Sequence, residues 1–106
     1  MADSGSVGEE RFDGDRVERV LSAQKRRVLR ALLDARVIPA DPILREGEVL
    51  HAEEYLTVCY ELHHVLLPEL ADTGGVEFDR SEDEVRRGPR FDELWRVLER
   101  IDDHDG

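Results

Sequence analysis

Apolar side chains recur at helical spacing from about residue 15 onward, after a start that is small, polar and acidic. In the first segment they line one side of a helix, and they are Val17, Val20, Leu21, Val28 and Leu32. Steps of three and four residues indicate an amphipathic helix. Ser22 could cap a fresh helix, so the segment is either one helix or a short helix followed by a longer one. Pro39 and Pro42 end the pattern, because proline disfavours helix in the residue before it.

The longest helical pattern covers residues 53–72. Its expected apolar side consists of Leu56, Cys59, Leu62, Leu66 and Leu70, joined by Tyr55, Val58 and Val65. The opposite side carries Thr57, Tyr60, Glu61 and His64. Pro68 removes one helical hydrogen bond and should kink or break the last turn. The Gly74-Gly75 pair ends the helix, because glycine readily adopts the left-handed cap.

Weak patterning separates the two helical segments. Residues 43–50 have Gly47 in their middle, and they predict either a short helix or a loop. After Gly75 the pattern alternates, which predicts strands at residues 76–78 and 84–86 around a turn at residues 80–83. One hairpin alone is marginal in water, so it must pack against the helices.

A final helix follows residues 88–89, and its apolar stripe consists of Phe91, Leu94, Trp95, Leu98 and Ile101. The predicted fold class is therefore mainly α with a small β-hairpin, in the order of a winged helix-turn-helix with a C-terminal helix. We expect residues 1–14 to be a disordered acidic tail, residues 15–88 to form the winged helix-turn-helix domain, and residues 89–106 to form a helix that could mediate dimerisation.

Acidic residues greatly outnumber basic ones in this chain. The net charge is −11, with 26 acidic residues against 15 basic ones, and Lys25 is the only lysine. This bias favours a protein adapted to molar salt, and the alternative is an acidic protein from a GC-rich genome. Cys59 is the only cysteine, so no internal disulfide can form. The start lacks the apolar core of a signal peptide, and no apolar run reaches the ~20 residues of a membrane helix. We therefore expect a cytoplasmic protein without membrane contact.

Two blocks of the chain carry a distinctive order of residues. The first is a leucine-serine pair, a basic cluster and a V-L-x-x-L run, carried by Leu21, Ser22, Lys25, Arg26, Arg27, Val28, Leu29 and Leu32. The second is carried by Leu62, His64, Leu67, Pro68, Leu70, Gly74, Val76, Phe78 and Asp79. Both blocks resemble small winged-helix proteins of unknown function that are abundant in halophilic archaea. The likeness covers roughly residues 17–87, and it implies a transcription-regulator fold and binding of double-stranded DNA. Residues 37–50 lack the leucine-alanine pair of the family's middle helix, and Glu69 stands where members often have a basic residue.

Charge is divided unevenly between the helical segments. Residues 16–36 carry seven basic and two acidic side chains, 7 − 2 = +5, whereas residues 53–72 carry five acidic ones and no Lys or Arg, −5. Phosphate neutralisation dominates DNA affinity. We therefore expect phosphate contacts from the arginines of residues 16–36 and of the hairpin at residues 76–86, which would be the wing. Residues 53–72, the third helix of a winged helix-turn-helix, would read the bases. The candidate DNA contacts are Lys25, Arg26, Arg27, Arg30, Thr57, Tyr60, His64, Arg86 and Arg87. Alternatively, the arginines form a solvated face that pairs with carboxylates.

The first functional hypothesis is a DNA-binding transcriptional regulator of a halophilic archaeon, dimeric through its C-terminal stripe. The second is a protein-interaction module on the same scaffold, whose acidic third helix binds a basic partner. Trp95 with Phe91 and Leu98 could instead form an aromatic ligand pocket, although such a stripe is more often core or a dimer contact.

Cys59 and His63 are spaced to share one metal ion, with His51 or His64 completing the set. The alternative is a buried thiol beside a packed imidazole, so we expect no metal and no cofactor. The same Cys–His pair lacks a phosphate loop, an oxyanion motif and an acid partner, and no enzymatic activity is predicted.

Overall fold

The computed structural model describes residues 12–105, with side chains through residue 100. In chain order the elements are α2 (Gly14–Asp34), β1 (Val37–Pro39), α3 (Ala52–Glu61), η1 (Leu62–Leu66), α4 (Leu67–Asp72), β2 (Val76–Asp79), β3 (Glu84–Arg87) and α5 (Phe91–Asp105). Helices with a small antiparallel sheet confirm the coarse prediction. Most of the expected acidic tail, residues 1–11, lies outside the described residues, and Gly14 already belongs to α2.

The first helical segment is a single helix of 21 residues. Asp13 caps it, since its side chain accepts hydrogen bonds from the backbone amides of Asp15 and Arg16. Ser22 does not start a second helix, because its hydroxyl donates to the carbonyl of Arg19, 3.0 Å away. The alternative with one continuous helix is therefore the right one.

The sheet has three antiparallel strands in the order β1-β3-β2. The hairpin of β2 and β3 matches the predicted wing and pairs Phe78 with Val85. Strand β1 was not predicted, because its two apolar residues precede a proline. Pro39 is tolerated because β1 lies at the edge of the sheet, where one side of the strand needs no partner.

Residues 52–72 are helical throughout, with a π-helical turn at η1 in the middle. Pro68 has no N–H to donate to residue 64, and the amide of Leu67 bonds the carbonyl of Leu62, five residues back. The predicted break at Pro68 does not occur, and a π-helical turn precedes the proline instead. Gly74 ends α4 with φ of 85°, as expected for a left-handed glycine cap.

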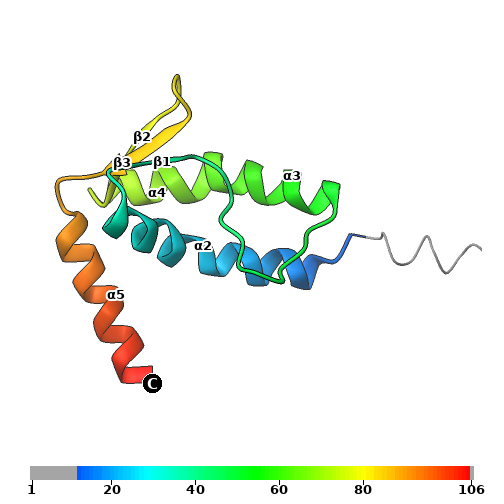
Figure 1. Ribbon diagram of the computed structural model, residues 1–106, viewed down its shortest axis with the longest axis horizontal. Coiled ribbons are helices and arrows are strands. Elements are labelled where there is room, and N and C mark those ends of the chain that lie inside the picture. The colour runs from blue at the N-terminus through cyan, green and yellow to red at the C-terminus, as the bar shows by residue number, and fades with distance from the viewer. Residues whose placement is uncertain (1–11, 106) are drawn as a thin grey trace, which may run out of the picture.

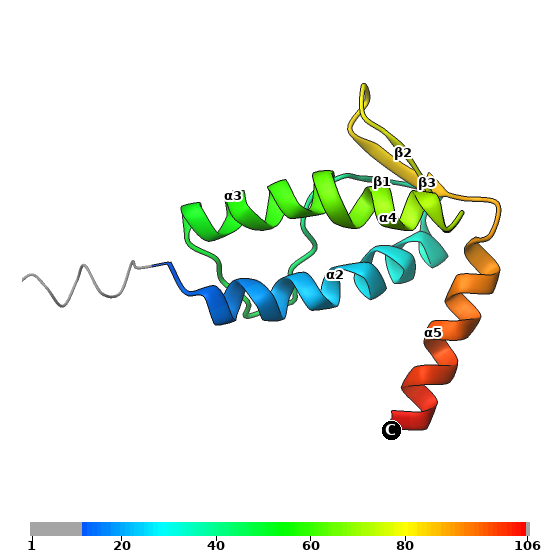
Figure 2. The same ribbon diagram turned by 180° about the vertical axis from the view of Figure 1, so that it is seen from behind.

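Residues 40–51 form a loop rather than a helix. Of the two alternatives for residues 43–50, the loop is therefore the right one, and it stands where a winged helix-turn-helix has its middle helix. The loop descends along α2 and returns to the start of α3 (Figures 1 and 2). Side chains of α2 bond both backbone groups of Ile43 in this loop, and the amide of Arg45 bonds the Glu48 side chain within it.

The core lies where α2 packs against α3, η1 and α4, and where the sheet closes one end. Leu29, Leu32, Leu62 and Leu67 are its largest fully buried apolar side chains. A smaller cluster of Val17, Val20 and Val58 joins the start of α2 to α3. Helix α5 begins beside the sheet and projects away from the other helices (Figures 1 and 2).

Candidate interaction site

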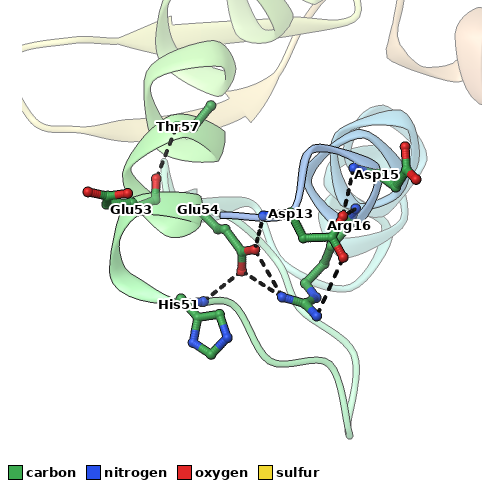
Figure 3. A network of polar contacts seen from close by, with 7 residues as sticks. All are labelled: Asp13, Asp15, Arg16, His51, Glu53, Glu54 and Thr57. Carbon is green, nitrogen blue, oxygen red and sulfur yellow. Dashed lines mark hydrogen bonds and ion pairs between the residues drawn. The ribbon is translucent and has the colours of Figure 1, made fainter. Parts of the chain in front are cut away.

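A buried carboxylate ties the start of α3 to the start of α2. The Glu54 side chain is 0% exposed and accepts hydrogen bonds from the backbone amides of Asp13, at 2.7 Å, and His51, at 2.8 Å. The Nη1 atom of Arg16 donates to both of its oxygens, at 2.9 and 3.1 Å (Figure 3). Burial raises the pKa of Glu54, but the two amides and Arg16 lower it further, so its pKa lies below the ordinary 4.5. Glu54 is thus held as a carboxylate inside the fold.

The loop before α3 is held by two side chains of α2. The amide group of Gln24, itself fully buried, donates to the carbonyl of Ile43 and accepts from its N–H, both at 2.9 Å. Arg27 donates to the same carbonyl at 2.7 Å and forms a two-pronged ion pair with Glu48 at 2.7 and 2.9 Å. These bonds position the loop without a middle helix.

We refer to Gln24, Arg27 and Glu48 as the loop clamp, because their bonds hold the loop against α2. Acid should weaken this clamp. The hydrogen bond from Arg27 and the backbone amide of Arg45 lower the pKa of Glu48 from 4.5 to about 2. Because the folded pKa lies below the unfolded one, the ionised form stabilises the fold fully above about pH 4.5, and this contribution disappears as pH falls toward 2. In urea titrations, Glu48→Gln should lower stability at pH 7 and flatten the decline of stability below pH 4.5. A decline that stays as steep in the variant would contradict this role.

An exposed stripe runs along α3 and into η1. Leu56 is 68% exposed and Tyr60 60% exposed, and His64, one turn further, is exposed as well. The rings of Tyr60 and His64 lie against each other at a tilt of 31°, with centroids 4.3 Å apart. The prediction that Leu56 belongs to the apolar inner side is wrong, because Val58 and Leu62 fill that side instead. Tyr60 and His64 lie on the outer side as predicted.

Carboxylates flank this stripe. Glu53 is exposed one turn before Leu56, and Glu61 is half-buried next to Tyr60. Within residues 12–100, no ion pair engages either of these two glutamates. We refer to Glu53, Leu56, Tyr60, Glu61 and His64 together as the acidic–aromatic face.

Two of the expected DNA-contacting arginines hold the fold together. Arg27 belongs to the loop clamp, and its side chain is only 11% exposed. Arg87 caps the end of α2: its Nε and Nη2 atoms donate to the carbonyls of Leu32 and Leu33, and its guanidinium lies 5.3 Å from the ring centre of Phe91. The sequence missed both roles, because the carbonyl acceptors are set by the tertiary fold.

Other expected basic contacts already have acidic neighbours. Lys25 pairs with Glu69 across α2 and α4 at 3.0 Å, and Arg86 pairs with Glu84 on the wing at 3.0 Å. Both pairs are partly exposed, where an ion pair contributes about 0–1 kcal/mol and could exchange for a phosphate. The alternative that arginines pair with carboxylates therefore describes part of this surface.

The remaining expected contacts lie on different faces. Arg30 is exposed on α2, with its guanidinium 5.8 Å from the ring centre of Trp95, and Arg26 is half-buried on the same helix. Thr57 donates its hydroxyl to the carbonyl of Glu53 at 2.9 Å. The structure thus gathers Thr57, Tyr60 and His64 on one helix and leaves the basic candidates on α2 and the wing.

Cys59 and His63 have no further His, Cys, Asp or Glu side chain placed to complete a metal site with them in the described part of the chain. The Nε2 atom of His63 contacts the carbonyl oxygen of Ala40 and lies 3.8 Å from Asp83. Burial, with the charges of Asp41 and Asp83, raises the pKa of the Cys59 thiol above 9. Over the described residues, no group of three or more His, Cys, Asp or Glu side chains could hold a metal ion. The imidazole of His63 packs against the ring of Phe78, with ring centres 5.7 Å apart.

The stripe of α5 is divided between core and surface. Phe91 is 3% exposed and belongs to the core, so its expected place in a dimer contact is wrong. Leu94, Trp95 and Leu98 are half-buried against the core. The side chain of Ile101 lies outside the described residues.

Comparisons of the chain with models of protein families, with curated proteins and with solved structures found no match. Across the described helices, none is long and apolar enough to cross a membrane.

Proposed function

We propose that the protein is an interaction module that binds a basic partner protein through the acidic–aromatic face. The observation that carries this proposal is the exposure of Leu56, at 68%, and Tyr60, at 60%, on a helix whose free charges are carboxylates. Exposed large apolar groups inside a charged rim are typical of binding surfaces, and tyrosine is a frequent anchor of protein interfaces.

The charge of this face selects the partner class. Glu53 and Glu61 flank Leu56 and Tyr60, so a helix with an apolar stripe and basic flanks would match both features. A phosphate backbone would meet the same carboxylates with repulsion. The rigid start of α3 also favours recognition, because the Glu54 network fixes the helix before any partner binds.

Double-stranded DNA is the second candidate partner, for a transcriptional regulator of winged-helix type in a halophilic archaeon. It is favoured by the order of helix, strand, helix, hairpin and by the exposure of Tyr60 and His64 on the third helical segment. If the partner is DNA, Arg30 and Arg86 would contact phosphates, whereas Arg27 and Arg87 would support the fold.

The two candidates can be separated by fluorescence anisotropy with two probes, a basic amphipathic helical peptide and a random-sequence duplex, in ~0.2 M and ~2 M KCl. We expect peptide binding that Leu56→Glu weakens at least about tenfold. Val49→Glu is the matched control, because Val49 is also 68% exposed but lies in the loop beside Arg16 and Arg19.

If Leu56→Glu and Val49→Glu changed the affinity for the peptide equally, the peptide would not bind through the acidic–aromatic face, and the proposal would be contradicted. Duplex binding that the pair Arg30→Glu and Arg86→Glu abolishes, with no peptide binding, would establish the DNA candidate instead. These two arginines are the right pair to change, because replacing Arg27 would also break the loop clamp.

A further inference from the structure

His63 lies where η1, the loop after β1 and the hairpin of β2 and β3 meet. Its Nε2 atom contacts the carbonyl oxygen of Ala40, the residue after β1. The same atom lies 3.8 Å from a carboxylate oxygen of Asp83, in the turn between the two strands of the hairpin. Its ring also packs against that of Phe78 in β2. One histidine therefore joins η1 to both the loop and the hairpin.

The hairpin turn is held to the loop at the same place. The backbone carbonyl of Asp83 accepts a hydrogen bond from the amide of Ala40 at 2.9 Å. Asp83 has φ of 58°, a left-handed conformation that aspartate and asparagine tolerate better than most residues. Because the hairpin projects from the helices (Figures 1 and 2), the contacts at Ala40 and His63 tie its turn to the rest of the fold.

Protonation of His63 adds a contact at this place and breaks none. The carbonyl of Ala40 can only accept, so Nε2 donates to it and Nδ1 takes the additional proton. The positive charge of the ring then lies 3.8 Å from the carboxylate of Asp83. The side chains of His63 and Asp83 are 26% and 59% exposed, so solvent screens this attraction and keeps it modest.

The other charges around His63 have a negative balance. Burial raises the pKa of Cys59, one helical turn before His63, and the carboxylates of Asp41 and Asp83 raise it further, so both lie close to this site. On the hairpin side, the guanidinium of Arg80 lies 5.1 Å from the centre of the aromatic ring that His63 contacts. No side chain of α2 bonds or pairs with His63 within the described part of the chain. Two carboxylates against one guanidinium attract the charge that His63 gains.

We propose that His63 is a pH-dependent latch, which holds the hairpin turn to η1 more tightly once its imidazole is protonated. Histidine ordinarily gains its charge as pH falls through roughly 6.5, and aspartate loses its charge only near about pH 4. The added stability of the turn is therefore present between these values and is lost as pH rises above roughly 6.5. This latch does not depend on what the acidic–aromatic face binds.

The other buried carboxylate contacts do not respond in the same window. The hydrogen bonds of Glu48 and Glu54 hold the pKa of each below the ordinary 4.5, so both stay ionised across it. A change in the hairpin turn near neutral pH is thus separable from a change in the loop clamp or at the start of α3.

The test is amide hydrogen exchange of the full chain at about pH 5.5 and about pH 7.5 in ~0.2 M KCl, corrected for the intrinsic pH dependence of exchange. The reporter is the Ala40 amide, because it loses its acceptor when the turn detaches. Its protection should be at least about twofold higher at the lower pH. The Gly88 amide bonds the carbonyl of Gly75 at the base of the hairpin, and its protection should not change.

Two conservative variants remove the charges of the latch. His63→Gln keeps a donor for the carbonyl of Ala40 but cannot become charged, and Asp83→Asn keeps a residue that tolerates the left-handed backbone. Each should abolish the pH response of the Ala40 amide. His64→Gln is the matched control, because His64 is the next residue but lies exposed against Tyr60, and it should retain the full response.

Three results would overturn the latch: a wild type whose Ala40 protection is the same at both pH values, a response that persists in His63→Gln, or a response that His64→Gln also abolishes. An equal response of the Gly88 amide would overturn it as well, because the whole hairpin or the whole fold would then be responding. A response that His63→Gln removes but Asp83→Asn leaves intact would overturn the assignment of Asp83 as the partner.

Discussion

Replacing Glu54 with glutamine should lower the midpoint of thermal unfolding by roughly 10 °C or more. The exchange keeps the shape of the side chain and leaves an acceptor for the amide of Asp13 or His51. It removes the charge that Arg16 requires and turns an N–H group toward a donor in a buried site. Because the Glu54 side chain is fully buried, the N–H group of the glutamine and one backbone N–H group would be left without a partner there, which costs about 1–3 kcal/mol each.

The matched control is Glu53→Gln, one position earlier on α3. It also removes a carboxylate from the first turn of the helix, so both variants lose the same favourable interaction with the helix dipole. Glu53 is exposed, and its exchange should change the midpoint by no more than roughly 2 °C. Equal effects of the two exchanges in circular dichroism melts would mean that the Glu54 network does not hold α3 to α2.

Replacing Gln24 with methionine should lower the free energy of unfolding by about 1–3 kcal/mol. Methionine fills nearly the same volume but leaves both the N–H and the carbonyl of Ile43 without the partner that Gln24 supplies. Hydrogen exchange should then accelerate selectively in residues 40–51, because the loop has no helical bonds of its own.

Lys25→Met provides the control for this exchange, since Lys25 is the next residue on α2 and is partly exposed. It should leave exchange in residues 40–51 unchanged. Unaltered protection of the loop in Gln24→Met would show that the Arg27 pair alone holds it, and the description of the clamp would then be wrong.

Patterns that depend on neighbouring residues were predictable from the sequence. The helices, the hairpin of β2 and β3 and the glycine cap follow from local spacing and turn chemistry. The exposed positions of Tyr60 and His64 followed from helical geometry. Leu56 was misplaced because an amphipathic pattern cannot distinguish a leucine that faces the core from one at the edge of the apolar side.

Features that depend on distant partners were not predictable in the same way. Strand β1 needs β3, which lies more than forty residues away, and Glu54 needs Asp13 and Arg16. The spacing of Glu54 three residues after His51 resembles the acidic half of a capping box, and this was a signal that could have identified it. Arg27 and Arg87 looked like phosphate ligands because a sequence shows their charge and not their acceptors.

Backbone amide chemical-shift mapping on the wild-type protein tests the proposed function most directly. A basic amphipathic peptide and a random-sequence duplex would be titrated separately into the ¹⁵N-labelled full chain in ~0.2 M and ~2 M KCl, because exposed charges are screened at the higher salt. The proposal predicts that the peptide shifts amides around Glu53, Leu56, Tyr60 and His64, while the duplex leaves them unchanged. Shifts from the duplex on α2 and the wing, with none from the peptide on α3, would contradict it.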